Sequence, residues 1–311
     1  MVSADALLTP NVMRTIEAAV TKHLGSGWRC EDSVDLADRS SHPAALLHGG
    51  ALSVFAKLID GAGAIDQATA ELSGLALIRN RSGAATPVPV GDGFVQLGER
   101  AVVLFEALAE HPPEQRTARD WEAIGRTLAN LHQVRGDVYG LDQDGYFGPL
   151  HQDNRPVAAN SWADFYADRR LLPWLATAVD AGHVPPDLAG RVEQIAGRLD
   201  ELVGPDLGPR LLHGDAQHHN FISTADGAVV IDASPYYGHP ELDLALVDYF
   251  TPVPGALFAA YTEISPIDAG FEDRRELWRL FAYLGVLTCD GASPFGRAFV
   301  RRLEAAVALY T

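Results

Sequence analysis

The hydrophobic pattern of the chain changes at His111-Pro112-Pro113, and this change limits the possible folds more than any other feature. Before it, apolar residues recur in short runs separated by the turn signals His48-Gly49-Gly50 and Gly91-Asp92-Gly93, a pattern typical of antiparallel hairpins. Helical spacing occurs there at Thr9–Gly25 and Ile65–Asn80. The strands expected in this part are Trp28–Leu36, Ala44–Leu47, Leu52–Leu58, Val88–Val90, Phe94–Leu97 and Ala101–Glu106.

After the prolines, most apolar residues follow helical spacing, with one island of strand pattern at Arg210–Asp232. The segment Arg135–Asn160 has no periodic pattern, and we expect a long loop there. The expected helices are Thr117–Val134, Ser161–Asp180, Asp187–Val203, Leu242–Phe250, Glu272–Leu287 and a last segment ending at Tyr310. We therefore predict an α+β, bilobal fold, with a small β-rich lobe at residues 1–107 and a large helical lobe at residues 108–311.

Composition excludes several classes of function. The 311 residues carry a net charge of −17, which disfavours a nucleic-acid partner because phosphate binding needs a basic face. No apolar run approaches the roughly 18 residues of a membrane span, and the N-terminus shows no signal-peptide pattern. The two cysteines, Cys30 and Cys289, cannot build a disulfide framework, so we expect a cytoplasmic protein.

Lysine is scarce in this chain, and one lysine stands in a predicted strand. Of 24 basic residues only Lys22 and Lys57 are lysine, and an ammonium group is a compact charge that arginine does not reproduce. Glu71 follows Lys57 by fourteen residues on a predicted helix. A strand lysine held by a helix glutamate can position nucleotide phosphates, although Lys57 could also be an ordinary edge-strand lysine and Glu71 a solvated helix residue. The backbone at Glu106 and Leu108, just before the connector, could then contact an adenine ring.

The densest polar cluster is His213-Gly214-Asp215, which Asn220 and then Asp232 follow on the two strands of a predicted hairpin. A hairpin loop centred on Asp226 places Asn220 opposite Asp232, and a shift of one residue still leaves both at the same end. An amide oxygen and a carboxylate there form a site suited to Mg²⁺. Asp215, in the preceding turn, is then free to accept a proton.

Two other interpretations of this cluster stay open at this point. Asp215 and Asn220 could be loop residues that bond to their own backbone, and Asp232 could cap the next segment. The histidines His213, His218 and His219 could instead hold a transition metal with Asp215, as in a metal-dependent hydrolase, although neither a cysteine nor an H-E-x-x-H pattern accompanies them.

The ordered set of lysine, glutamate, His-Gly-Asp, asparagine and aspartate resembles the aminoglycoside phosphotransferases, which are relatives of the protein-kinase fold. In finer detail the chain resembles the fructosamine kinase (ketosamine-3-kinase) family over most of its length. The matching segments are Gly125–His132, Tyr146-Phe147-Gly148 with Gln152 and Asn154, Ser161–Tyr166, Arg169-Arg170-Leu171 and Tyr236–Ala245.

This resemblance implies an ATP-dependent, Mg²⁺-dependent kinase that phosphorylates a hydroxyl group of a small polar molecule. It implies that Asp215 is the catalytic base and that Asn220 and Asp232 bind Mg²⁺. It also implies that Lys57 and Glu71 position the ATP phosphates. The expected substrate is an amine-bearing, sugar-like molecule.

Other residues are expected to support the site or to contact the acceptor. The resemblance implies that Asp243 and His213 brace the catalytic loop. The acceptor is expected to lie between the catalytic aspartate and the unpatterned loop, with Gln217, Tyr146 and Trp162 as candidate contacts.

The chain departs from the family pattern where the acceptor is expected. Where the family pattern reads His-Gly-Asp-Leu-Trp, this chain has Ala216 and Gln217 in place of the leucine and tryptophan. Where the family usually carries an Asn-His pair in the late helix, the matching positions are Gly285 and Val286. An antibiotic-inactivating phosphotransferase is therefore the alternative to a ketoamine kinase. A non-catalytic nucleotide-binding protein would instead lack one of the chemistry-bearing residues, and none of them is missing.

Overall fold

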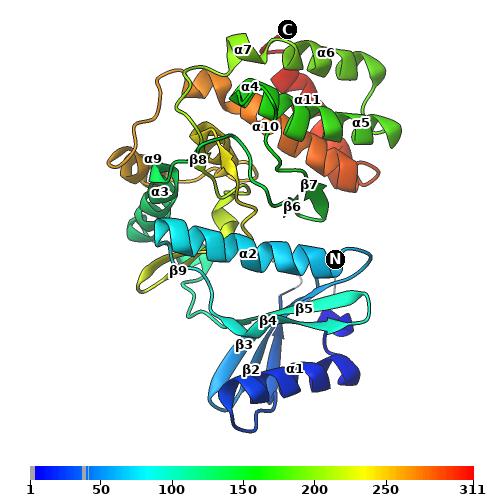
Figure 1. The fold of residues 1–311 in the computed structure, drawn as a ribbon, viewed down its shortest axis with the longest axis vertical. Helices are drawn as coiled ribbons and strands as arrows, with labels where there is room; N and C mark the ends of the chain where they lie inside the picture. The colour runs from blue at the N-terminus through cyan, green and yellow to red at the C-terminus, as the bar shows by residue number, and fades with distance from the viewer. Residues whose placement is uncertain (1–3, 37–39, 41) are drawn as a thin grey trace.

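The computed structural model describes residues 4–36, 40 and 42–311, and Figure 1 shows them in two lobes. The smaller lobe contains a five-stranded antiparallel sheet with the strand order β1-β2-β3-β5-β4. Its elements are η1 (Ala4–Ala6), α1 (Pro10–Leu24), β1 (Asp32–Asp35), β2 (Ala44–Gly49), β3 (Leu52–Ile59), α2 (Ala64–Ser82), β4 (Pro89–Leu97) and β5 (Arg100–Glu106). The division at residue 107 stays a prediction.

Side-chain alternation buries this sheet on both faces. On β5, Val102 and Leu104 pack in the cluster that includes α1, whereas Val103 and Phe105 pack in the cluster that includes α2. Helix α2 lies between the sheet and the larger lobe (Figure 1). A residue of α2 can therefore contact the sheet and the larger lobe together.

The hairpin predicted at Gly91-Asp92-Gly93 is wrong. Both flanking segments belong to the single strand β4 and pair with β5, with Pro89 opposite Phe105 and Phe94 opposite Val103. The pairing shifts between these points, and both glycines have positive φ angles of 62° and 85°. Glycine permits these angles without strain, so the glycines form a bulge inside a strand.

The strand predicted at Trp28–Leu36 is shorter in the structure, where β1 begins at Asp32. Trp28 is 3% exposed, and its Nε1 donates to the carbonyls of Gly49 at 2.7 Å and Leu52 at 2.9 Å. The indole therefore fastens the segment before β1 to the β2–β3 turn through a side chain and not through strand pairing.

The larger lobe is mainly helical and contains three two-stranded sheets, of which the β6–β7 hairpin lies on the side that faces α2 (Figure 1). The long helix α10 packs against α5, α8 and α11, and α3 packs against α9. The elements of the larger lobe are η2 (Pro113–Gln115), α3 (Ala118–Gln133), β6 (Gly145–Phe147), β7 (Leu150–Gln152), α4 (Trp162–Tyr166), the π-helix η3 (Ala167–Leu171), α5 (Leu172–Asp180), α6 (Pro186–Ala196), α7 (Leu199–Leu202), β8 (Arg210–Leu211), η4 (His218–Asn220), β9 (Phe221–Thr224), β10 (Gly227–Val230), β11 (Tyr237–Gly238), α8 (Pro240–Leu246), α9 (Gly255–Thr262), α10 (Phe271–Asp290) and α11 (Pro294–Val307).

Several boundaries in this lobe differ from the sequence predictions. The segment 135–160 is not wholly irregular, because β6 and β7 pair within it. The predicted helix 161–180 includes a π-helical turn, and the predicted helix 187–203 is interrupted between α6 and α7. Helix α9 was not predicted, because its residues are apolar on all sides and show no amphipathic period.

Among the described residues, no helix is long and apolar enough to cross a membrane. Both Cys30 and Cys289 are free thiols.

Candidate active site

Lys57 lies in β3, is 6% exposed, and joins the two lobes. Its ammonium group donates to Glu71 Oε1 on α2 at 2.8 Å and to Asp232 Oδ1 after β10 at 2.5 Å. Burial lowers the pKa of Lys57, but the two carboxylates outweigh burial and raise that pKa overall. The ammonium group therefore stays charged at neutral pH. The structure brings the three residues together, and their role toward ATP stays a prediction.

Asp215 lies in the loop between β8 and η4. Gln217 Nε2 donates to Asp215 Oδ1 at 2.7 Å. Burial raises the pKa of Asp215 to about 7, Gln217 opposes the rise, and the nearby carboxylate of Asp232 adds to it. A carboxylate whose pKa lies near neutrality is suited to general-base chemistry.

The β9–β10 hairpin brings Asn220 and Asp232 to one end, with the register shifted by one residue from the centred loop. Phe221 pairs with Val230, so Asn220 stands opposite Ile231, whose N–H donates to the Asn220 carbonyl at 3.0 Å. Asp232 follows with a φ of 49°, a left-handed conformation that aspartate tolerates better than most residues. This conformation ends the strand pairing and directs the chain away from the hairpin.

Asp243, fully buried in α8, holds the start of the loop that carries Asp215. Its carboxylate accepts hydrogen bonds from the N–H groups of His213 at 2.6 Å and Gly214 at 3.1 Å, and it lies 3.1 Å from His132 Nε2. Gly214 has a φ of 83°, and a Cβ there would lie 1.9 Å from the Ser234 carbonyl, so the loop requires glycine at this position. Burial lowers the pKa of His213, which favours a neutral imidazole in a supporting role.

The oxygen donors of Asn220 and Asp232 fit a Mg²⁺ ion bound together with nucleotide phosphates. Asn220 Nδ2 donates to the Asp215 carbonyl at 2.8 Å, which turns the amide oxygen to the other side. Burial raises the pKa of Asp232, but contact with Lys57 outweighs it and lowers that pKa. The Asp232 side chain is 45% exposed, so its carboxylate is both ionised and accessible.

A family model described as fructosamine kinase matches residues 12–306. The chain belongs to the fructosamine kinase family. A probable ketoamine kinase of Synechocystis is 35% identical over 169 residues, which cover 53% of this chain and 55% of that protein. For a probable ketoamine kinase of Pasteurella multocida the identity is 31%, over 52% of this chain and 54% of that protein. The chain therefore spans about half the length of these curated relatives.

Solved structures agree with the family and with the predicted protein-kinase-like α+β fold. A crystal structure from Thermobifida fusca, named for fructosamine-3-kinase, superposes with a TM-score of 0.78 at 30% identity, covering 94% of this chain and 99% of that chain. An aminoglycoside phosphotransferase superposes with a TM-score of 0.61 at 15% identity, covering 96% and 99%, and shows the fold alone.

The prediction that Trp162 contacts the acceptor does not agree with its burial in the structure. The residue is 4% exposed, and its ring stacks on Phe165 and lies 5.9 Å from the ring of Trp278. Its position at the start of α4 points the ring into the core, where a tryptophan buries much apolar area. We therefore assign Trp162 to packing of the helical lobe.

Tyr146 lies on β6, a strand that packs against α2 of the smaller lobe. Its N–H donates to Ser234 Oγ at 3.1 Å, two residues after Asp232. Burial and the nearby carboxylates of Asp66 and Asp144 raise the pKa of its phenol. The position is compatible with the predicted acceptor contact, which stays a prediction.

The two departures from the family pattern have structural consequences. Gln217, where the resemblance implies tryptophan, donates directly to the Asp215 carboxylate. At Gly285 on α10, a Cβ would lie 2.9 Å from the Trp174 ring and 3.6 Å from the Phe147 ring. A side chain at position 285 would therefore meet these aromatic rings, and Val286 is partly buried against the same core.

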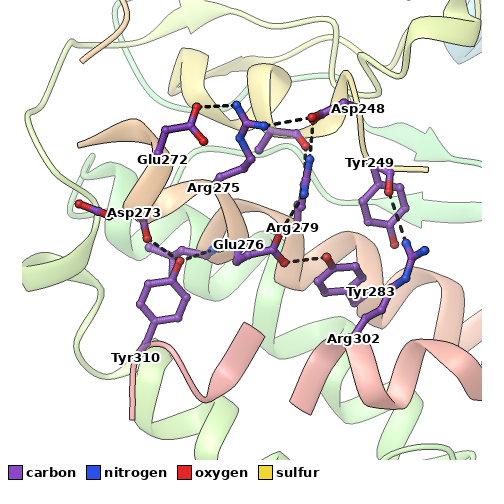
Figure 2. Close-up of polar contacts among 12 residues, drawn as sticks. Asp248, Tyr249, Glu272, Asp273, Arg275, Glu276, Arg279, Tyr283, Arg302 and Tyr310 are labelled. Carbon is purple, nitrogen blue, oxygen red and sulfur yellow. Dashed lines mark hydrogen bonds and ion pairs between the residues drawn. The ribbon is translucent and has the colours of Figure 1, made fainter. Parts of the chain in front are cut away.

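Figure 2 shows a polar network around Asp248 and α10 that the sequence did not predict. Asp248 accepts from Arg275 at 3.0 Å and Arg279 at 2.5 Å, which fixes the segment after α8. The next residue, Tyr249, is 4% exposed and lies 5.3 Å from the Tyr283 ring. Burial raises the pKa of Tyr249, and the nearby carboxylate of Asp215 adds to that rise. The helix predicted at 242–250 ends at Leu246 in the structure, so Asp248 and Tyr249 lie in the segment after α8.

The predicted adenine contacts lie at the end of β5. The Glu106 N–H donates to the Val88 carbonyl at 2.8 Å, and the Leu108 carbonyl accepts from the Glu110 N–H at 3.0 Å. Contact with an adenine ring through the Glu106 carbonyl and the Leu108 N–H therefore stays a prediction.

The transition-metal interpretation is not supported by the structure. Within the described ranges, no group of three or more histidine, cysteine, aspartate or glutamate side chains is arranged to hold a metal ion. His213 is fully buried beneath the loop, and the His218 ring packs on the Trp121 ring at 5.4 Å.

Proposed function

We propose that this protein transfers the γ-phosphate of ATP to a hydroxyl group of a ketoamine, which is a sugar joined to an amine. The observation that carries the proposal is the geometry around Asp215: Gln217 holds its carboxylate, and Asp232, which Lys57 contacts across the lobes, lies close enough to raise its pKa. The family and the names of its relatives support ketoamines as the acceptor class.

Asp215 would accept the proton of the acceptor hydroxyl as the new O–P bond forms. Its raised pKa matches this role, because a base that releases and takes up protons near pH 7 is most effective there. The amide of Gln217 holds one carboxylate oxygen, which leaves the other oxygen to face the acceptor. The aspartate is thereby oriented before the acceptor binds.

Lys57, held by Glu71, would bind oxygens of the ATP phosphates, and Asn220 with Asp232 would hold Mg²⁺. A bound Mg²⁺ neutralises negative charge on the phosphates. In the structure Lys57 contacts Asp232 directly, so nucleotide binding would exchange part of that ion pair for contacts with phosphate. This exchange couples the two lobes to nucleotide binding.

An amine-bearing acceptor suits the charge of the protein. The net charge of −17 attracts cations at long range, and Tyr146 lies beside the carboxylates of Asp66 and Asp144. We propose that the amine end of the ketoamine lies toward this side and the sugar hydroxyl toward Asp215.

The test is ATP consumption with Mg²⁺ against ketoamines such as fructoselysine and against spectinomycin and hygromycin B, with mass spectrometry of the products. We expect the ketoamine to gain one phosphate group. Phosphorylation of an antibiotic with inert ketoamines would make Gln217 and Gly285 determinants of a different specificity. Turnover of neither acceptor together with failure to bind Mg²⁺ and ATP would contradict the proposed kinase activity.

A further inference from the structure

Arg116 connects the segment between the lobes to the catalytic loop. Its Nη1 donates to the His218 carbonyl at 2.9 Å, and its Nη2 donates to the Phe221 carbonyl. These two carbonyls lie on either side of the residue pair that contains Asn220. One planar group therefore spans the short turn η4.

Turn η4 has little support of its own. It has three residues, and such short 3₁₀ turns have poor hydrogen-bond geometry. The turn is closed by the Asn220 N–H, which donates to the Gln217 carbonyl at 2.8 Å, and the His218 N–H donates outward to the Val247 carbonyl at 3.2 Å. The hydrogen bonds from Arg116 to the His218 and Phe221 carbonyls, here called the clamp, therefore have a large effect on the orientation of Asn220.

An aromatic ring supports the clamp. The Arg116 guanidinium lies over the Trp121 ring, 5.2 Å from its centroid, and the same ring packs against the His218 imidazole at 5.4 Å. The connector is also fixed nearby, because the His111 N–H donates to the Ser223 carbonyl at 2.7 Å. The Trp121 ring thus supports the guanidinium, and the His111 bond fixes the connector that leads to Arg116.

We propose that Arg116 is a positioning residue: it fixes the backbone from which Asn220 presents its amide oxygen to the metal. This inference rests on the proposed function, because that function assigns Asn220 as a metal ligand. A planar guanidinium can bridge two carbonyls, whereas a lysine ammonium provides a single point charge. Arg116→Lys therefore keeps the charge and removes the bridge.

Charge and geometry predict opposite effects on metal binding. A positive charge near the site repels a divalent cation, so if Arg116 acted through charge alone, Arg116→Gln would strengthen metal binding. If Arg116 acts by holding the loop, both Arg116→Gln and Arg116→Lys weaken binding. Residues that orient metal ligands typically change metal affinity by about 10- to 100-fold when mutated.

The experiment measures Mn²⁺ binding to the full chain in the presence of ADP by electron paramagnetic resonance, which needs no acceptor. We expect Arg116→Lys and Arg116→Gln to lower Mn²⁺ affinity by about 10-fold. The matched control is Arg119→Gln on the exposed side of α3, which should bind Mn²⁺ like the wild type. Trp121→Leu, which removes the supporting ring and keeps both donors, should show a smaller loss.

Thermal unfolding of each variant separates a local effect from a general loss of folding, and Trp121→Leu serves as the test if the Arg116 variants do not fold. Wild-type Mn²⁺ affinity in both Arg116 variants, or tighter binding in Arg116→Gln, overturns the inference. Asn220→Ala separates the assignment of Asn220 as a metal ligand from the positioning role of Arg116. If Asn220→Ala keeps full Mn²⁺ affinity, Asn220 is not a metal ligand and the positioning role of Arg116 fails as well. If Asn220→Ala loses affinity while the Arg116 variants do not, only the role of Arg116 fails.

Discussion

At the residue scale, the chemistry of the candidate site depends on how burial and hydrogen bonding act against each other on Asp215. Burial raises the pKa of this carboxyl group, and the hydrogen bond from Gln217 lowers it. The sequence could predict Asp215 as a base because the motif and the hairpin placed it beside Asn220 and Asp232. It could not predict the bond from Gln217, because a glutamine two residues away has many rotamers.

Replacing Gln217 by alanine should shift the pH dependence of the reaction. Without the donated hydrogen bond the ionised form of Asp215 loses stabilisation, so the acid limb of the kcat/KM profile should move to higher pH by about one unit. The measurement is a pH–rate profile of both proteins with saturating Mg²⁺. An unchanged limb, or a shift to lower pH, would contradict the role of the bond.

Asp215→Asn should change stability in a pH-dependent way. The pKa of Asp215 is raised from 3.8 to about 7 in the folded protein, so folding favours the protonated form. That stabilisation is complete below the unfolded pKa and is lost as pH rises through about 7. We therefore expect Tm of the variant to exceed that of the wild type at about pH 8, with the difference shrinking toward about pH 5. Calorimetry at both pH values checks this, and a difference independent of pH would disprove it.

Lys57→Arg should remove most of the activity although it conserves the charge. The ammonium group is almost enclosed by Glu71 and Asp232, and a broad guanidinium does not fit the same contacts. Loss of a preorganised electrostatic contact typically costs about 100-fold or more in kcat. Steady-state kinetics with ATP give the answer, and wild-type kcat in this variant would eliminate phosphate positioning as the function of Lys57.

At the element scale, the predictions held where a single period governed a segment and failed where side-chain contacts replaced it. Helix α1 begins at Pro10 as expected, and Ser161 caps α4 by accepting from the Asp164 N–H at 3.0 Å. The hairpin prediction fails at the glycines of β4, because glycine permits a bulge inside a strand as readily as a hairpin turn. The strand prediction fails at Trp28, because its indole contacts residues distant in sequence that a local pattern cannot predict.

The packing of α3 on α9 depends on Gly125. A Cβ there would lie 2.1 Å from the Leu257 carbonyl, which is backbone and cannot rotate away. We expect Gly125→Ala to lower the free energy of unfolding by about 2–3 kcal/mol through forced separation of the helices. Denaturant unfolding measures this change.

The matched control for that prediction is Gly190→Ala in α6, where a Cβ meets nothing within 4 Å. Alanine is the better helix former, so this variant should gain about 0.5–1 kcal/mol. Equal effects of the two substitutions would show that backbone approach at Gly125 does not matter.

At the scale of the whole molecule, polar side-chain contacts connect the two lobes next to the candidate site. Lys57 of the smaller lobe contacts Asp232 of the larger one, and Gln67 Nε2 on α2 donates to the Gly148 carbonyl of the β6–β7 turn at 3.1 Å. The bilobal α+β fold was predictable because the change of period at the prolines divides the chain. The acceptor could not be predicted, because a residue such as Tyr249 comes near Asp215 only through the fold, and the sequence around it carries no motif that points to the site.

The most direct test of the central claim is phosphate transfer from ATP to fructoselysine by the wild-type protein and by Asp215→Asn, measured side by side with ADP binding. We expect the wild type to yield one phosphorylated product and the variant to lose about 100- to 10,000-fold in rate while it binds ADP normally. Equal rates in the two proteins would contradict Asp215 as the base. A wild type that binds ADP and Mg²⁺ but leaves fructoselysine unmodified would contradict the ketoamine as acceptor.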